Sequence, residues 1–256
     1  MHNLFFYIPI FYRYYSREKG KFFIPFMMTD FLPSLLIGNI FSASSLIENF
    51  FVYTLSFLAM FNVYEIGYIL NDCVTVKNEE KPTLRLDENE MVYFENHCLW
   101  IFCVRLFIFL VCTVVLFHFY ENISIFVLAN IALLLVYLLH DYFRNRIKYF
   151  TNFGLNVGKY FIPLLLIMNS NYIIYYLILF SFFPLLRCLT YILERKIVRL
   201  NMDYFQLVYF FIALVILILI RFFFIPVSLC TIGFCGFFFF YRLVIFFVNK
   251  KNNGVR

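Results

Sequence analysis

The sequence predicts an all-α integral membrane protein. Hydrophobic residues make up 64% of the 256 residues, the mean hydropathy is +0.84, and only 14% of the residues are charged, whereas a typical soluble domain has about 25% charged residues. The apolar runs are long and continuous, each near the roughly 20 residues that a helix needs to cross a bilayer. A membrane β-barrel would show shorter segments of alternating polarity. We therefore expect a bundle of about eight to nine transmembrane helices.

Polar segments divide the apolar runs into an ordered series of elements. We expect a cytoplasmic amphipathic lead-in over residues 1–21, a single transmembrane domain over 22–248 and a cytoplasmic tail over 249–256. Pro82, in the polar loop after the second span, interrupts the helix there, because proline cannot continue a helix. The expected spans cover approximately residues 22–43, 49–70, 91–117, 123–140, 154–168, 172–189, 204–220 and 222–248.

The placement of the basic residues predicts the topology. Both termini and the loops 71–90, 141–153 and 190–203 hold nearly all the Lys and Arg residues, whereas the turns on the other side hold only Arg221. Loops rich in Lys and Arg stay in the cytoplasm. We therefore expect both termini and these three loops to be cytoplasmic, with the protein in a bacterial inner membrane.

Two classes of site are not indicated. The net charge is +6, but the basic residues sit at helix ends, as topology requires, and no signature of nucleic-acid binding is present. The seven cysteines are scattered and mostly lie within apolar runs, without a Cys or His pair at zinc-binding spacing. We interpret them as small hydrophobic residues.

A dense group of polar residues ends the second span and continues into the loop after it. Glu65, Asp72 and Glu79 recur every seven residues. Asn71, Thr75 and Glu79 recur every four. Both spacings place side chains on one face of a helix, and converging oxygen ligands suit Mg²⁺, which leaves positions for phosphate oxygens. From spacing alone the alternative stays open, namely a solvated loop whose acids balance its own basic residues.

The segment NDCVTVKNEEKPTLR resembles the first aspartate-rich motif of the UbiA superfamily of intramembrane prenyltransferases. That motif reads N-D-x-x-D-x-x-x-D and is often followed by Lys-Pro and an Arg. Its place after the second span, on the expected cytoplasmic side, matches the family as well. The matching positions are Asn71, Asp72, Glu79, Lys81, Pro82 and Arg85, with Thr75 where the family has its second Asp.

The resemblance implies a helical bundle around a central, apolar cavity that takes the lipid tail of the substrate. It also implies a Mg²⁺ cofactor bound by Asn71, Asp72 and Glu79, of which Asp72 and Glu79 are candidate catalytic residues. The metal would hold the phosphate or diphosphate and neutralise charge on the departing oxygens. Lys81 and Arg85 would add charge-assisted contacts to the same group.

The second motif of the family, D-x-x-x-D after the sixth helix, is incomplete. Tyr191 and Glu194 stand where it begins, and Arg195 follows in place of further acids. We expect these three residues to contact substrate. The departure implies a site with a single Mg²⁺ that binds additional phosphate directly.

A basic segment follows the fourth span. Arg144, Arg146 and Lys148 lie there, and Lys159 lies inside the next span. They would suit a second, multiply phosphorylated substrate, with Arg144 and Arg146 binding it and Lys159 in a catalytic role. The alternative is that they only anchor the topology, which fits Lys159 least because intramembrane charges are costly.

The resemblance implies an enzyme that transfers a prenyl group from a polyprenyl (di)phosphate to an acceptor. Some members of the superfamily instead transfer phosphoribose from phosphoribosyl diphosphate to a polyprenyl phosphate for cell-surface polysaccharide synthesis, and this is the first alternative. A membrane transporter or an inactive scaffold is the second. The expected partners are a polyprenyl or isoprenyl lipid and the bilayer, without nucleic acid.

Three charged residues lie inside apolar spans: Asp30, Glu65 and Arg105. Charged groups at such depth pair with each other or line a cavity. Arg105 is expected either to pair with Asp30 or Glu65 or to contact substrate.

Overall fold

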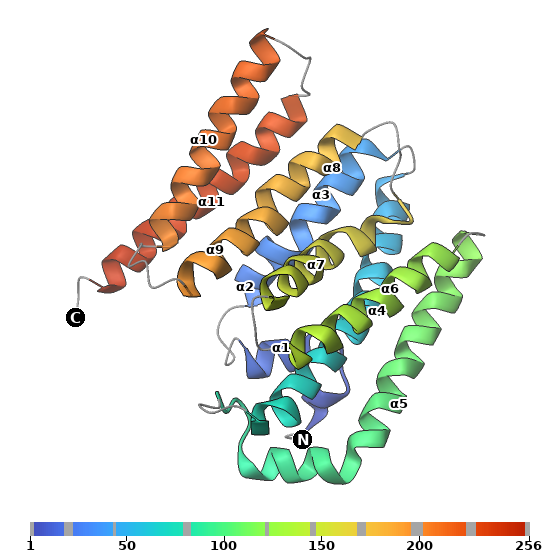
Figure 1. Cartoon of the computed structure of the whole chain (residues 1–256). Coiled ribbons are helices and arrows are strands. Elements are labelled where there is room, and N and C mark those ends of the chain that lie inside the picture. Colours follow the sequence, from blue (N-terminus) through green and yellow to red (C-terminus); the bar gives the residue numbers. More distant parts are fainter. Residues whose placement is uncertain are drawn as a thin grey trace. The chain divides into compact units, whose positions relative to one another are not determined.

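The computed structural model describes residues 3–17, 23–42, 45–78, 83–120, 123–143, 147–167, 173–195, 202–223 and 229–253, and within these ranges it contains helices and no strand (Figure 1). Several of the helices are apolar and long enough for a bilayer environment. The prediction of an all-α membrane bundle is confirmed.

The number of long apolar helices is smaller than the number of expected spans. The first expected span holds a shorter apolar stretch, Ile24–Ile40. The fifth corresponds to a helix of 15 residues, Ile147–Phe161, which at 1.5 Å per residue is too short for a hydrocarbon core of about 30 Å. Within the described ranges, six helices are long and apolar enough to cross a membrane: Leu46–Lys77, Glu88–Phe119, Ser124–Tyr142, Tyr176–Leu193, Met202–Phe222 and Leu229–Asn249.

The contacts divide the chain into two compact units, residues 1–173 (unit 1) and 174–256 (unit 2). Whether both belong to one transmembrane domain around a central cavity stays a prediction. Unit 1 contains η1 (Leu4–Phe6), α1 (Phe11–Ser16), α2 (Phe23–Phe26), η2 (Met27–Phe31), α3 (Leu32–Phe41), α4 (Leu46–Cys73), η3 (Thr75–Asn78), α5 (Glu88–Phe119), α6 (Ser124–Tyr142), α7 (Ile147–Phe161) and η4 (Ile162–Leu164). The elements of unit 2 are α8 (Ile173–Phe180), whose first residue is the last of unit 1, η6 (Ser181–Leu185), α9 (Leu186–Arg195), α10 (Met202–Phe223) and α11 (Leu229–Asn253).

Helix α4 is the centre of unit 1. It contacts α1, α3, α5, α6 and α7, and α5 returns beside it in the opposite direction (Figure 1). Ser45 caps its start by accepting a hydrogen bond from the backbone N–H of Glu48. Asp87 and Glu90 cap the start of α5 in a reciprocal capping box. Because α4 is surrounded, its polar residues must find partners inside the protein.

The chain between α2 and α3 passes through one wide helical turn, the π-helix η2, which contains Thr29 and Asp30. Such turns shift the register of the residues after them and are frequent at functional sites. Asp30 is completely buried there, so the turn directs a carboxylate into the interior of unit 1.

Residues 3–17, which comprise η1 and α1, form a segment that we call the N-terminal strap. It packs against α4 and α5 through a cluster of buried apolar residues. The sequence predicts an amphipathic lead-in here, and the structure shows a segment that belongs to the core of unit 1. The cluster includes Phe5, Phe6, Tyr12, Ile69 and Phe94.

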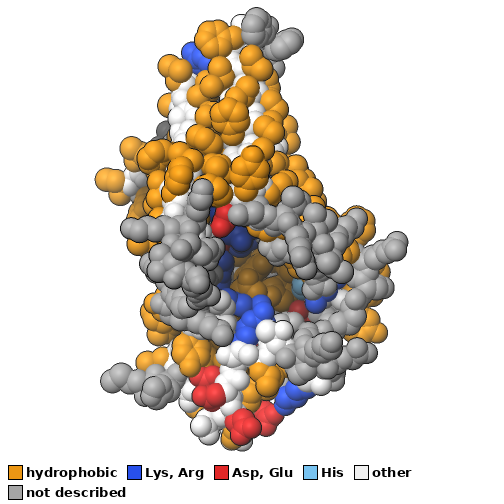
Figure 2. Space-filling view, turned by 90° about the vertical axis from the view of Figure 1, so that its left-hand side faces the viewer, with side chains coloured by type: hydrophobic (Ala, Val, Ile, Leu, Met, Phe, Trp, Pro, Cys, Tyr) orange, Lys and Arg blue, Asp and Glu red, His pale blue; other side chains and the backbone are white. Residues whose placement is uncertain are grey.

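Unit 2 is held together by aromatic side chains, with Phe183 and Phe238 at 4.9 Å between ring centroids. Pro184 lies in the π-helix η6, and the hydroxyl of Tyr209 donates to the carbonyl oxygen of Ser181, at 2.6 Å. An apolar groove lies between η6 and α10. Hydrophobic side chains cover most of the exposed surface of α10 and α11 (Figure 2), as expected for helices that face lipid.

Gly67 allows α4 and α6 to approach closely. A Cβ atom at this position would lie 2.2 Å from the ring of Tyr137, which is buried. We expect Gly67→Ala to destabilise unit 1 by about 1–3 kcal/mol, because the ring must move within a packed core. The matched control is Gly154→Ala on α7, whose added methyl group meets only Val136, at 3.4 Å. Thermal unfolding in detergent would check this, and equal melting temperatures for both variants would contradict it.

Candidate functional site

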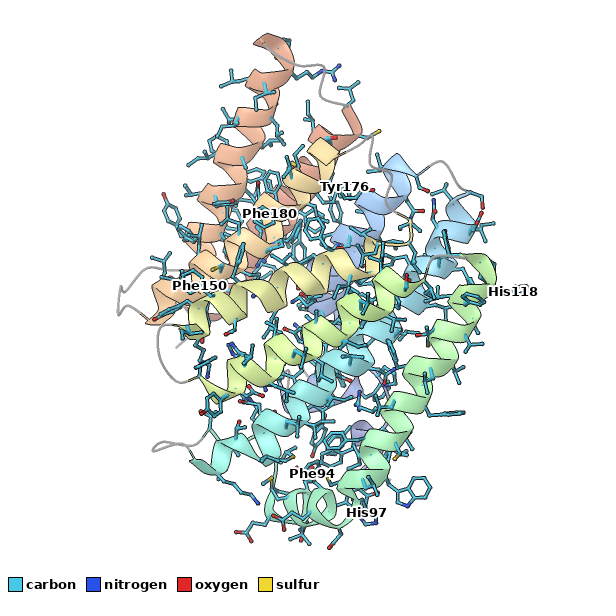
Figure 3. The ribbon with its side chains drawn as sticks, turned by 45° about the vertical axis from the view of Figure 1, so that its right-hand side comes forward. Phe94, His97, His118, Phe150, Tyr176 and Phe180 are labelled. Atoms are coloured by element: carbon cyan, nitrogen blue, oxygen red, sulfur yellow. The ribbon has the colours of Figure 1, made fainter. Side chains whose placement is uncertain are left out.

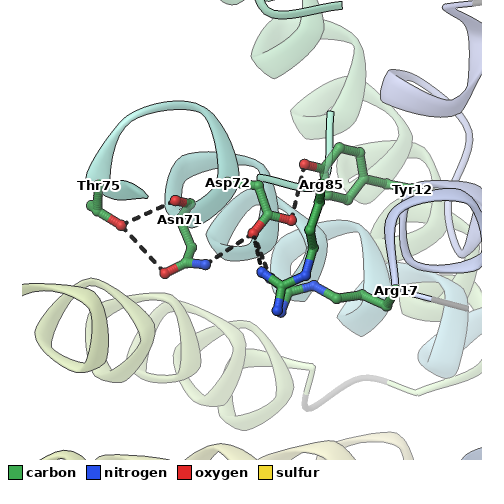
Figure 4. Close-up of polar contacts among 6 residues, drawn as sticks. All are labelled: Tyr12, Arg17, Asn71, Asp72, Thr75 and Arg85. Atoms are coloured by element: carbon green, nitrogen blue, oxygen red, sulfur yellow. Dashed lines mark hydrogen bonds and ion pairs between the residues drawn. The ribbon is translucent and has the colours of Figure 1, made fainter. Parts of the chain in front are cut away.

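The polar residues at the end of α4 gather around Asp72, which is 3% exposed (Figure 4). Its Oδ1 atom accepts hydrogen bonds from Arg17, at 2.9 Å, and Arg85, at 2.8 Å. Asn71 donates to the same oxygen, at 2.9 Å, and the hydroxyl of Tyr12 donates to Oδ2, at 3.2 Å. Burial raises the pKa of Tyr12, and the negative charge of Asp72 raises it further. Tyr12 therefore stays protonated and can donate this hydrogen bond.

The two arginines at Asp72 are only partly buried. Their side chains are 21% exposed for Arg17 and 26% exposed for Arg85. The guanidinium of Arg17 lies over the ring of Tyr68, 4.3 Å from its centroid, and its Nε atom has no hydrogen-bond partner among the described residues. The carboxylate and the two guanidinium groups together carry one net positive charge, so this cluster suits an anion with several acceptor oxygens.

Asn71, near the end of α4, and Thr75, the first residue of η3, continue the cluster, as their spacing predicts. The hydroxyl of Thr75 donates to the backbone carbonyl of Asn71, at 3.2 Å, and to its side-chain oxygen, at 3.3 Å. Asn71, Asp72 and Thr75 thus form a continuous hydrogen-bonded row. Glu79, the third member of both predicted rows, lies outside the described residues.

The described residues do not form a ready metal site. They contain no group of three or more His, Cys, Asp or Glu side chains that could hold a metal ion. Both oxygens of Asp72 already accept hydrogen bonds, one of them from two cations. Mg²⁺ could bind Asp72 directly only if these arginines moved away, since like charges repel at such distances. Asn71, Asp72 and Glu79 as metal ligands therefore stay a proposal.

A second cluster surrounds Asp30 in the π-helix η2. Arg13 of the strap lies 2.5 Å from one carboxylate oxygen, and Lys159 of α7 lies 2.6 Å from the other. The hydroxyl of Tyr160 donates to the carbonyl oxygen of Thr29, at 2.7 Å. Lys159, which was predicted to be catalytic, is only 4% exposed and is one of the two cations in this buried cluster. Its catalytic role stays a prediction.

The third cluster is a completely buried ion pair between Glu65 of α4 and Arg105 of α5. Arg105 donates to Glu65 at 2.7 Å and to the carbonyl oxygens of Phe5, Phe6 and Ile8 in the strap. Glu65 in turn accepts the backbone N–H groups of Ile10 and Arg13, both at 2.8 Å. Of the two sequence alternatives for Arg105, the structure supports pairing with Glu65.

Glu65 caps the first turn of α1 from another helix. Ile10, just before this turn, has a φ of 74°, a conformation that is rare for a β-branched residue. A carboxylate at a helix N-terminus satisfies N–H groups that have no partner within the helix. The Glu65–Arg105 pair thus fixes the backbone of the strap from both sides.

The strap supplies residues that were not predicted from the sequence to belong to the site. Tyr12 and Arg17 contact Asp72, and Arg13 contacts Asp30. Arg13 and Arg17 are four residues apart, so their common helical face was readable from the sequence. Nothing in the sequence indicated that acids on α4 and η2 would lie opposite that face.

The remaining predicted site residues are distributed as follows. Arg85 lies at Asp72, as expected. Tyr191 lies on α9 of unit 2 and is half-buried. Two histidines that were not predicted to belong to the site, His97 and His118, lie towards opposite ends of α5 (Figure 3), and the ring of His97 stacks on Tyr93 at 4.2 Å between centroids. The predictions for Glu79, Lys81, Arg144 and Arg146, and for the side chains of Glu194 and Arg195, fall outside what the structure describes.

No protein-family model, no curated protein and no solved structure matches this chain. The likeness to the UbiA superfamily accordingly rests on the residues quoted from the sequence.

Proposed function

We propose that this chain is a membrane-embedded transferase that acts on a polyprenyl (di)phosphate and passes the prenyl group to an acceptor. The observation that carries the proposal is the convergence of Arg17 and Arg85 on Asp72 at the end of a long apolar helix. Arginine is well suited to phosphate because its planar fork can donate two parallel hydrogen bonds. A protein that binds a polyprenyl phosphate needs a phosphate-binding group of this kind next to the lipid that surrounds the polyprenyl chain.

In this proposal the arginines bind the phosphate and Asp72 holds them in place. Each guanidinium uses one terminal nitrogen on Asp72 and retains other N–H donors for a ligand. Mg²⁺, when bound, would neutralise charge on the leaving diphosphate. We further propose that the site faces the cytoplasm, since the positive-inside rule predicts that side for the loop that follows α4.

Phosphoribosyl transfer from phosphoribosyl diphosphate to a polyprenyl phosphate is the second candidate. It is favoured by the excess of cations, because two basic side chains share one carboxylate at both Asp72 and Asp30. A donor with several phosphate groups would compensate more of this charge than a prenyl monophosphate would.

Membranes containing the protein would be supplied with labelled isoprenyl diphosphate or with labelled phosphoribosyl diphosphate. The first candidate predicts label in a prenylated acceptor, whereas the second predicts label in a phosphoribosylated lipid. Membranes with an Arg17→Gln and Arg85→Gln double variant are the matched control. Absence of protein-dependent transfer from either donor, together with normal folding of the protein, would favour a transporter or scaffold.

A further inference from the structure

The N-terminal strap turns its charged groups inwards, beside the buried Phe5 and Phe6, and carries a second set of apolar side chains on its outer surface. Arg13 is 8% exposed and Ser16 is 2% exposed. Arg13 contacts Asp30, and Arg17 contacts Asp72. Tyr12, which is completely buried, also donates to Asp72. The charges of the strap are therefore turned towards carboxylates in the interior of unit 1.

Apolar and aromatic side chains make up much of its outer surface. Leu4 is 54% exposed and Ile8 is 38% exposed, and the backbone N–H of Ile8 donates to the carbonyl oxygen of Leu4, which places them one turn apart. Phe11 and Tyr15 are 52% and 43% exposed and lie four residues apart on α1. In water an amphipathic segment would keep its outer surface polar. The strap is apolar on its outer surface as well as on part of its inner surface, which indicates an apolar environment outside.

The strap lies beside the last turns of a membrane-length helix. Its backbone is held by Glu65, and its side chains reach Asp72, next to the last residue of α4. These two residues are seven apart, or about 10 Å along a helix axis. In a membrane-spanning α4, this would place the strap at the depth where the helix leaves the hydrocarbon core and enters the headgroup region.

We propose that the outer surface of the strap, formed by Leu4, Ile8, Phe11 and Tyr15, inserts into the headgroup and acyl-chain boundary of the bilayer. The partner is the phospholipid surface itself. The arginines at positions 13 and 17 are directed inwards, so insertion does not need anionic lipid, unlike the usual basic amphipathic helix. This proposal is independent of the proposed transferase activity.

The single tryptophan of the chain makes a direct test possible. In a Trp100→Phe background, Phe11→Trp places a fluorophore on the strap of the full-length protein, reconstituted in phosphatidylcholine vesicles. Leu110→Trp, at a position 57% exposed in the middle of α5, serves as the lipid-side reference. Glu88→Trp, at an exposed position in the first turn of α5, serves as the water-side reference.

We expect Phe11→Trp to be quenched by brominated phosphatidylcholine and protected from aqueous acrylamide, as Leu110→Trp is, with the same result when anionic lipid is added. Leu4→Trp provides a second probe on η1 in case one variant fails to fold. Acrylamide quenching of both strap probes to the level of Glu88→Trp, without quenching by brominated lipid, would overturn the proposal. Protection of both strap probes from acrylamide and from brominated lipid would also overturn the proposal, since the strap would then be covered by protein.

Discussion

Replacing Arg105 by methionine is expected to destabilise unit 1 by about 3–5 kcal/mol, because it leaves Glu65 as an unpaired charge in the interior. Both side chains of the pair are completely buried. The substitution also removes the donors to the carbonyl oxygens of Phe5, Phe6 and Ile8. A denaturant titration of the protein in detergent micelles measures the loss in the free energy of unfolding.

The matched control is Lys77→Met. Lys77 and Glu95 also form an ion pair, but their side chains are 51% and 54% exposed, and exposed pairs contribute only about 0–1 kcal/mol. A double variant, Arg105→Met with Glu65→Gln, should lose less stability than the two single variants added together, since it removes both charges. A loss for Arg105→Met no larger than that for Lys77→Met would show that the pair does not hold the strap.

In the proposed transferase, replacing Asp72 by asparagine is expected to reduce transfer by roughly 100-fold or more, the effect of removing one organising group from a charged active site. The substituted amide would keep the shape of the carboxylate and lose its charge. The guanidinium groups of Arg17 and Arg85 would then repel each other and leave their positions. Initial rates of label transfer in reconstituted vesicles measure the effect, and Glu95→Gln, which removes an exposed acid, is the control.

The same variant separates two roles for Asp72. If Asp72 binds Mg²⁺ directly, the Mg²⁺ concentration needed for half-maximal activity should rise in Asp72→Asn, and excess Mg²⁺ should restore part of the rate. If Asp72 instead positions the arginines, excess Mg²⁺ should have no effect, and Arg17→Gln and Arg85→Gln should show a similar loss. Full activity of Asp72→Asn would rule out both roles and the site itself.

The fold class could be predicted from the sequence because it depends on composition and on run length. A continuous apolar run must form a helix in a bilayer, since no water is present to satisfy the backbone. The number of spans could not be predicted equally well. The run around residues 154–168 is apolar in part, but the helix there begins at Ile147 and ends at Phe161.

Part of the candidate site could also be predicted from the spacing of residues along the sequence. Asn71, Asp72 and Thr75 lie within about one helical turn, so their spacing determines that they lie together. Arg85 lies 13 residues from Asp72, within reach across a single loop. Local spacing is sufficient for such contacts, because the helix fixes the distances.

The sequence by itself determined an all-helical membrane protein with a polar cluster at the end of one apolar helix. Only the tertiary structure decided which charges pair. Glu65 and Asp72 lie on the same helix, yet Glu65 binds Arg105 and the strap backbone, whereas Asp72 binds Arg17 and Arg85. These partners are 13 to 55 residues away in the chain. A buried charge must be neutralised by a group that packing brings near it. The local spacing of residues along the chain does not predict which distant segments pack together.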